Sequence, residues 1–338
     1  MEENDMKNNI WKNGIMGVIT GDALGCPVQF LSREQVARNP VTGMRGYGTF
    51  HLPAGSWTDD GSLTMAALVS ILEKKCVDPE DIMDRFVRWL NDGEYTPFGE
   101  SFDNGRATTE SIFRYIRTHD VRTCGGRGAS DNGNGSLMRI MPVCLYAFTM
   151  QRAGKMTDEE AVALIHCISG LTHNHLRAKI ACGLYFFMVR EILTDSTNTP
   201  KERTLAECLQ AGLDAGFAFY EKDPAILEEL RCYDRLRDLA AFENVPVSKI
   251  RGSGYVVAAL EAAVWSLLQE DSFEDALLTA VNLGEDTDTV AAIAGGLAGL
   301  FYGYSQIPSK WLCVIQRRDW IESVCDETNA ASENGFGA

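Results

Sequence analysis

The stretch LGEDTDTVAAIAGGLAGLFYGY, from Leu283 to Tyr304, predicts the helix around which this chain is organised. Acidic and hydroxyl side chains follow Gly284, where the helix would begin, and the free N–H groups of a helix start favour both kinds. The helix itself is rich in Gly and Ala, and Gly is unfavourable in a helix interior. We therefore expect close neighbours on most sides of it. Its polar start is compatible with a simple cap or with a ligand site.

A second acidic helix start lies far upstream, in Trp57-Thr58-Asp59-Asp60-Gly61. Thr58 is a suitable N-cap, and one capping residue does not require two carboxylates behind it. The two starts together offer four carboxylates and two hydroxyls, with no Cys or His. These hard oxygen ligands suit Mg²⁺ or Mn²⁺ better than zinc. The starts are more than 200 positions apart, so only a shared core could bring them together.

Composition narrows the class of protein. The chain has 338 residues, 45% of them hydrophobic, which is sufficient for a sizeable core. Its net charge of −16, with no basic run, argues against nucleic acid or an anionic membrane as a partner. The ten cysteines are scattered without a C-x-x-C pair, so we expect free thiols in a cytoplasmic protein. No signal peptide or membrane span is predicted.

Helical periodicity covers most of the chain and predicts one all-α, compact, multi-helix domain over residues 1–328, with residues 329–338 as a disordered tail. Gly14, Gly17, Gly21 and Gly25 recur at helical spacing and predict a smooth face for packing against another helix. The fragment Tyr47–Leu52 gives the only extended signal in its half of the chain. The other predicted helices include 9–30, 78–91, 107–117, 136–148, 157–171, 175–193, 204–220 and 253–268.

The densest glycine loop is TCGGRGASDNGNG, from Thr123 to Gly135. It precedes a helix predicted to begin at Ser136, and bare N–H groups at such a place can bind anions. By itself this signal is weak, because most such loops only connect helices. His173 is interpreted as a single pocket histidine, because His175, two residues away on a helix, would point to another side.

Seven motifs in order resemble those of the ADP-ribosylglycohydrolase family, from about Gly14 to Tyr304. They are GDALGCPVQF at 21–30, WTDDGSLT at 57–64, FDNG at 102–105, NGNGSLMR at 132–139, LTH at 171–173, GYVVAALEAAVW at 254–265 and GEDTDTVAAIAGGLAG at 284–299. Members of that family are all-α hydrolases that hold two Mg²⁺ ions and cleave the bond between ADP-ribose and a protein side chain. The resemblance implies an ADP-ribosylated protein or other conjugate as substrate and ADP-ribose as product.

The resemblance also assigns roles to residues. It implies a binuclear metal site, with Mn²⁺ as a possible substitute for Mg²⁺, whose ligands are Thr58, Asp59, Asp60, Asp286, Asp288 and Thr289. Asp103 matches an acidic residue proposed to act in catalysis, and Asp59, Asp60 and Asp288 are also counted as catalytic. The substrate-binding positions are Gln29, Asn132, Gly133, Asn134, Gly135, Ser136, His173 and Tyr255. Gln29 departs from the family's usual Glu, and a neutral amide can coordinate or donate a hydrogen bond but cannot accept a proton at pH 7.

Three other functions remain open on the sequence alone. A protein of the same fold could bind ADP-ribose without turnover, as the amide of Gln29 would allow. A two-metal phosphohydrolase would use the same carboxylates but release AMP or phosphate. An all-α prenyl-diphosphate enzyme is disfavoured, because Asp59-Asp60 lacks the third carboxylate of a D-D-x-x-D motif. The acceptor linkage (arginine, serine or another), the client protein and the oligomeric state are left open.

Overall fold

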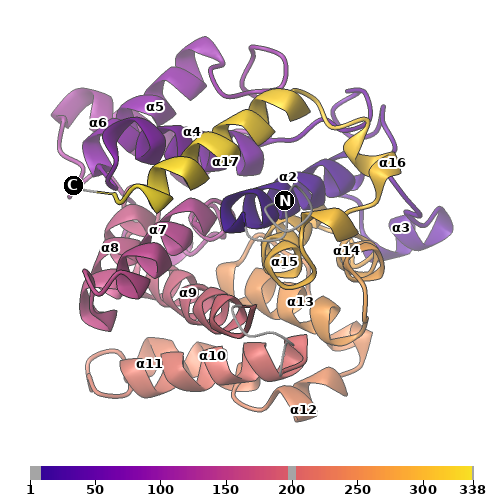
Figure 1. The fold of residues 1–338 in the computed structure, drawn as a ribbon. Coiled ribbons are helices and arrows are strands. Elements are labelled where there is room, and N and C mark those ends of the chain that lie inside the picture. The colour runs from indigo at the N-terminus through magenta and orange to yellow at the C-terminus, as the bar shows by residue number, and fades with distance from the viewer. Residues whose placement is uncertain (1–8, 197–202, 337–338) are drawn as a thin grey trace.

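The structure, a computed structural model, describes residues 9–196 and 203–336 and shows a helical protein with no strand in those ranges (Figure 1). The all-α prediction is confirmed. The α-helices are α2 (Ile10–Gly25), α3 (Arg33–Arg38), α4 (Asp59–Lys74), α5 (Pro79–Asp92), α6 (Arg106–Thr118), α7 (Met141–Arg152), α8 (Asp158–Gly170), α9 (Leu176–Ser196), α10 (Leu205–Tyr220), α11 (Leu227–Leu230), α12 (Leu239–Glu243), α13 (Val256–Leu268), α14 (Phe273–Val281), α15 (Thr287–Tyr302), α16 (Ser309–Leu312) and α17 (Arg318–Glu333). Short 3₁₀ helices are η1 (Cys26–Val28), η2 (Ala129–Asp131), η3 (Arg231–Leu236), η4 (Val247–Lys249) and η5 (Tyr304–Gln306).

Two expectations about local structure are wrong. The fragment Tyr47–Leu52 is a turn, closed by a 2.6 Å hydrogen bond from the Tyr47 N–H to the Leu52 carbonyl, because no neighbouring strand pairs with it. The predicted disordered tail is partly helical, since α17 runs to Glu333. Phe336 is 1% exposed, and its ring packs against Trp11 and Tyr146 with centroid separations of 5.8 and 5.3 Å. Burial of that ring holds the end of the chain in place; residues 337–338 lie outside the described ranges.

The centre of the molecule is the pair α2 and α15, which come from opposite ends of the chain and lie against each other (Figure 1). Glycines make this approach possible. A Cβ atom on Gly17 would lie 2.1 Å from the Gly295 carbonyl oxygen, and one on Gly21 would lie 2.0 Å from the Ala291 carbonyl oxygen. The predicted smooth glycine face is therefore confirmed. It sets the separation of two helices whose ends carry the candidate site.

Gly21→Ala is expected to destabilise the protein, because the obstructing atom is backbone and cannot move without separating α2 from α15. Overpacking of this kind costs about 1–3 kcal/mol, so we expect the melting temperature (Tm) to fall by several degrees in thermal unfolding. Gly43→Ala is the matched control, since its Cβ would meet only the Trp311 Nε1 atom, at 3.4 Å. Equal melting temperatures for the two variants would contradict the close packing of α2 on α15.

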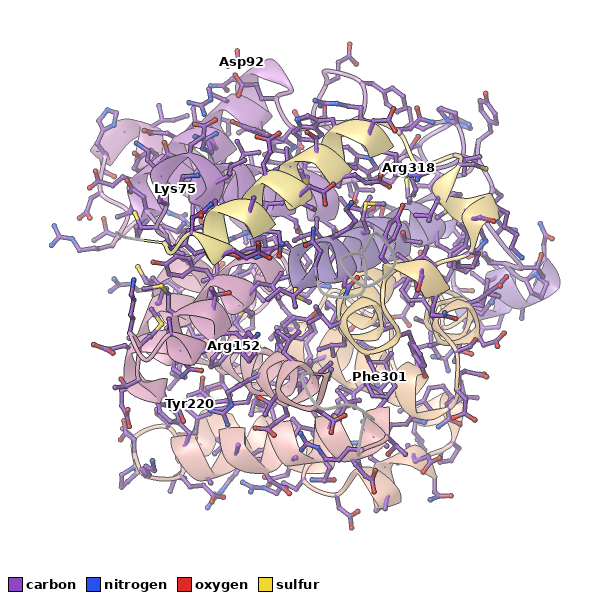
Figure 2. The ribbon with its side chains drawn as sticks, viewed as in Figure 1. Lys75, Asp92, Arg152, Tyr220, Phe301 and Arg318 are labelled. Carbon is purple, nitrogen blue, oxygen red and sulfur yellow. The ribbon has the colours of Figure 1, made fainter. Side chains whose placement is uncertain are left out.

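The remaining helices surround this pair, and their side chains fill the spaces between the ribbons, with many nitrogen and oxygen atoms at the outline of the molecule (Figure 2). None of the ten cysteines is paired in a disulfide in the described structure, and six of them are buried. Within residues 9–196 and 203–336, no helix is both long and apolar enough to cross a membrane.

Candidate active site

The start of α4 is held by a buried carboxylate from α2. Both oxygens of Asp22 lie 2.9 Å from the Thr58 N–H nitrogen, and its Oδ2 also accepts a 2.8 Å hydrogen bond from the Gly61 N–H. Thr58 in turn caps the helix by accepting from the Asp60 N–H, as predicted. Asp22 therefore fixes the segment that carries Asp59 and Asp60. The sequence offered only one sign of this role, an acidic residue inside an otherwise apolar helix.

The start of α15 is held equally firmly. Gly284 and Glu285 both have positive φ angles, of 77° and 68°, and the Glu285 backbone pairs with the segment that follows η1. The Phe30 N–H donates to the Glu285 carbonyl, and the Glu285 N–H donates to the Leu31 carbonyl, each at 2.7 Å. The Asp286 N–H donates to the Gly252 carbonyl, also at 2.7 Å. These bonds fix the positions of Asp286 and Asp288.

The two acidic helix starts meet. The Thr58 hydroxyl oxygen lies 3.4 Å from Oδ2 of Asp60 and 3.4 Å from Oδ2 of Asp288. The Thr289 hydroxyl donates to the same oxygen of Asp60 at 3.2 Å. The sequence could not show this meeting, because it depends on α4 and α15 both packing against α2 in the core.

Burial makes this cluster electrostatically unfavourable on its own. The pKa values of Asp59, Asp60 and Asp288 are raised well above the usual value, first by burial and then by repulsion from neighbouring carboxylates. Burial also raises the pKa of Asp22 to about 7, although hydrogen bonds from Thr58 and Gly61 oppose the shift. Such a group of acids needs either protons or positive charge to be stable.

The residues fit divalent cations in their chemistry. One oxygen each of Asp60 and Asp288 is buried without a hydrogen-bond partner in the described structure, and so is Oε1 of Gln29. Buried polar atoms normally have a partner, and unpaired carboxylate and amide oxygens suit Mg²⁺ or Mn²⁺. Among the described residues no three acidic, His or Cys side chains are already closed into a metal-ligand set. The metal ligands therefore remain a prediction.

Gln29 joins the carboxylate cluster to Asp103. Its amide nitrogen donates to Oδ2 of Asp103 at 2.7 Å and lies 3.5 Å from Oδ1 of Asp286. Asp103 has a left-handed backbone, with φ of 56°. Burial raises the pKa of the Asp103 carboxyl, and the hydrogen bond from Gln29 opposes that shift. The amide at position 29 thus donates a hydrogen bond to Asp103 and orients it.

The glycine-rich loop lies on the other side of Asp286. The Asn134 side chain donates to Oδ2 of Asp286 at 2.7 Å, and its backbone N–H donates to the Gly254 carbonyl at 3.0 Å. His173 lies beneath the loop, where Cβ atoms on Gly133 and Gly135 would come within 3.2 and 2.8 Å of its ring. Burial lowers the pKa of His173 to about 3, so this imidazole is neutral. It supports the loop and cannot supply positive charge to an anion.

The expected helix at Ser136 is wrong, because α7 begins at Met141. Pro142 suits the first turn of a helix, and the preceding segment is used in buried contacts. The Ser136 hydroxyl accepts from the Ser169 hydroxyl at 2.9 Å, and Arg139 donates to the Thr172 hydroxyl at 2.9 Å. Asn132–Gly135 therefore has no helix N-terminus directly behind it, and any anion binding there depends on loop N–H groups.

Tyr255 lies at the edge of the site, 39% exposed. Its hydroxyl accepts a 3.0 Å hydrogen bond from Arg177, which also donates to Glu229 at 2.6 Å. Arg177 and Glu229 were not expected from the sequence, because they are far from Tyr255 along the chain. The pair orients an aromatic ring that presents part of its surface to solvent.

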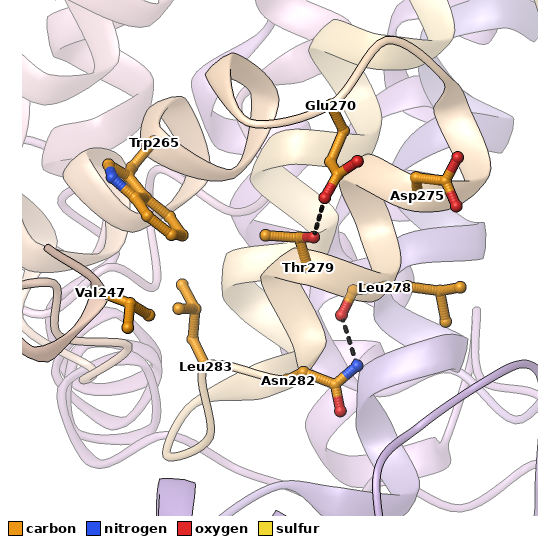
Figure 3. A pocket seen from close by; sticks show the side chains of 8 residues that line it. All are labelled: Val247, Trp265, Glu270, Asp275, Leu278, Thr279, Asn282 and Leu283. Atoms are coloured by element: carbon orange, nitrogen blue, oxygen red, sulfur yellow. Dashed lines mark hydrogen bonds between the residues drawn. The ribbon is translucent and has the colours of Figure 1, made fainter. Parts of the chain in front are cut away.

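A separate cavity lies between η4, α13 and α14 (Figure 3). It is bordered by Trp265, Thr279 and Leu283, and the Thr279 hydroxyl donates to Glu270 at 2.9 Å. None of the predicted site residues lines it. It is therefore distinct from the carboxylate cluster.

Comparisons with known proteins show which family the chain resembles. The family model described as ADP-ribosylglycohydrolase matches residues 7–336. The chain is 31% identical to the ADP-ribosylarginine hydrolase Tri1 of Pseudomonas putida (strain GB-1), over 94% of this chain and 76% of that protein. It is 29% identical to the ADP-ribosyl-dinitrogen reductase glycohydrolase of Rhodospirillum rubrum, over 90% of this chain and 89% of that protein. A solved structure entitled ADP-ribosylglycohydrolase-related protein complex superimposes with a TM-score of 0.75 and 29% identity, over 97% of this chain and 99% of that one.

Proposed function

This chain belongs to the ADP-ribosylglycohydrolase family, and on that basis we propose that it hydrolyses the bond between ADP-ribose and arginine side chains of modified proteins. The observation that carries the proposal is the meeting of the two acidic helix starts beside Asp103. The arginine linkage is supported by two relatives named as ADP-ribosylarginine hydrolases, 31% and 28% identical, each over 94% of this chain.

We assign the cation ligands to Thr58, Asp59 and Asp60 on one side and to Asp286, Asp288 and Thr289 on the other. Two Mg²⁺ or Mn²⁺ ions bound there would neutralise the carboxylates, orient the sugar and make water more acidic. The cluster's unpaired oxygens and raised pKa values support this assignment.

Asp103 is the residue that we assign to proton transfer. Hydrolysis of a glycosidic bond passes through a state in which the anomeric carbon gains positive charge, and a carboxylate then accepts the proton of the attacking water. Burial makes Asp103 a stronger base than an exposed aspartate. The bond from Gln29 holds the accepting carboxylate in a single orientation.

The remaining residues suit the rest of ADP-ribose. The chain carries a net charge of −16, so a pyrophosphate needs local donors, and the backbone of Asn132–Gly135 is the part we assign to it. The partly exposed ring of Tyr255, held by Arg177, offers a surface for the adenine base. Asp286 lies between the Tyr255 end of the site and the Gln29–Asp103 pair. One of its oxygens accepts from Asn134, and the other lies near the Gln29 amide.

If Gln29 acts by orienting Asp103, Gln29→Leu is expected to lower kcat. Hydrogen bonds to charged groups contribute about 1.5–3 kcal/mol, which corresponds to roughly 10- to 100-fold in rate. Asp103→Asn should lower kcat by about 10²- to 10⁴-fold. The double variant should be no slower than Asp103→Asn alone, because both substitutions impair the same proton transfer. Gln306→Leu, at an exposed glutamine, is the control. Additive losses would show that Gln29 acts independently of Asp103.

Release of ADP-ribose from a modified protein tests the proposed function directly. Arginine- and serine-linked substrates would be incubated with Mg²⁺ or with EDTA, and the products separated by chromatography. We expect free ADP-ribose from the arginine-linked substrate with Mg²⁺ and almost none with EDTA. AMP or phosphate would instead identify a phosphohydrolase. Tight binding without release from any linkage would identify an ADP-ribose-binding module.

A further inference from the structure

Three aromatic side chains form a partly exposed cluster at the edge of the site. Phe30 is 64% exposed, its ring centroid lies 6.2 Å from that of Phe50, and Phe50 lies 5.3 Å from Phe102. Phe30 follows Gln29 directly in the chain, and Phe102 directly precedes Asp103. We call Phe30, Phe50 and Phe102 the aromatic rim. The aromatic rim is therefore adjacent in sequence to Gln29, which orients Asp103, and to Asp103, which we assign to proton transfer.

The backbone keeps the aromatic rim in place. Phe30 has a φ of 68°, a left-handed conformation that is uncommon for a bulky residue. It is fixed there by the 2.7 Å hydrogen bond from its N–H to the Glu285 carbonyl. Next to Phe50, Thr49 donates to the Gln29 carbonyl at 2.7 Å through its hydroxyl and to the Pro27 carbonyl at 3.1 Å through its N–H. The exposed rings are therefore carried by segments that hydrogen bonds hold in place.

Two hydrogen-bonded series of residues start at Asp286 and define the two ends of the site. One arm runs from Asp286 through Asn134 and Gly254 to Tyr255. The other runs from Asp286 through Gln29 to Asp103 and the aromatic rim. With adenosine at Tyr255 and the scissile bond at Asp103, the group on the far side of that bond lies toward the rim. That group is the acceptor side chain.

We propose that the aromatic rim binds the guanidinium group of the modified arginine, which deepens the proposed function and rests on it. A guanidinium is a planar cation that stacks on aromatic faces. Two acidic residues lie next to the rim in the chain or its backbone contacts: the exposed Glu285, whose carbonyl accepts from the Phe30 N–H, and Asp103, which directly follows Phe102. This combination of aromatic faces and carboxylates recognises a cation and repels an anion.

The test measures acceptor recognition separately from ADP-ribose binding. Phe50→Leu is the main variant, because Phe50 is adjacent in sequence to no site residue, and Phe30→Leu is the second. Phe113→Leu is the matched control, since Phe113 is also exposed, by 52%, but lies on α6 and has no ring contact in the described structure. For each, KM and kcat would be measured on an arginine-linked protein and on a serine-linked one, with Kd for free ADP-ribose.

We expect each rim variant to raise KM for the arginine-linked protein about three- to tenfold, the size of one cation–π contact. The Kd for ADP-ribose and the constants of Phe113→Leu should change by less than about twofold. An unchanged KM, an equal loss of ADP-ribose affinity, or an equal rise in KM for the serine-linked protein would each overturn the assignment.

Failure of the proposed function would be distinguishable. If the wild type releases no ADP-ribose from arginine, hydrolysis is ruled out, and the aromatic rim is judged by equilibrium binding of an arginine-ADP-ribosylated peptide followed by fluorescence anisotropy. Weaker binding of that peptide by Phe50→Leu, with unchanged binding of ADP-ribose, supports the rim. Equal binding of the peptide by both proteins overturns it.

Discussion

Asp59→Ala and Asp288→Ala are each expected to abolish release of ADP-ribose, lowering kcat/KM by at least about 10³-fold. Each change removes a carboxylate that we assign to the cations. Activation of water and orientation of the sugar at such a site contribute several kcal/mol, and each 1.36 kcal/mol is about tenfold in rate. The measurement is the initial rate of ADP-ribose release at saturating Mg²⁺.

These variants should lose activity without losing the fold. Both carboxyls are buried and repel their neighbours, so their removal relieves unfavourable interactions in the metal-free protein. We therefore expect Tm in EDTA to stay level or rise. Asp319→Ala is the control, because Asp319 is an exposed acid in the first turn of α17. A near-normal rate of ADP-ribose release by Asp288→Ala would show that Asp288 is not part of the catalytic site.

The second large effect is a fall in the stability of the metal-free protein as pH rises. The unfolded chain releases the proton of Asp22 near its ordinary pKa of 3.8, whereas the folded protein holds it to about 7. The pKa values of Asp59, Asp60 and Asp288 are raised in the same direction, because these carboxyls are buried beside one another. The folded state therefore binds more protons than the unfolded state, and its stability is greatest below about pH 4 as far as these groups are concerned. That contribution is lost as pH rises from the unfolded pKa to the folded pKa of each group. The loss is about 1.4 kcal/mol per pH unit for each group that is protonated only in the folded state.

Thermal unfolding in EDTA between about pH 5 and pH 8 would measure this loss. Mg²⁺ should reverse it at the higher pH, because a cation that binds only the folded state stabilises that state by mass action. Asp288→Asn should show both a shallower pH dependence in EDTA and a smaller response to Mg²⁺. A wild-type Tm that rises with pH in EDTA, or that ignores Mg²⁺ at pH 8, would contradict a repulsive carboxylate cluster.

Much of the fold could be predicted from local pattern. Helical periodicity and capping identified α4 with Thr58 at its start, α15 with its acidic first turn, and the glycine face of α2. These features depend on residues within a few positions of one another, so their physics is contained in short stretches of sequence. The wrong predictions arose where contacts between distant segments outweigh the local pattern. Buried contacts delay the start of α7 to Met141, and burial of Phe336 orders a segment whose composition suggested disorder.

The sequence by itself thus determined an all-α chain with two acidic helix starts and a family resemblance that the comparisons confirm. Only the tertiary structure decided that Thr58 lies against Asp288, that Asp22 anchors α4 and that Gln29 orients Asp103. These contacts join residues that are 230, 39 and 74 positions apart. Such contacts depend on how the helices pack together in the core, because no single segment buries enough surface to fix its position alone.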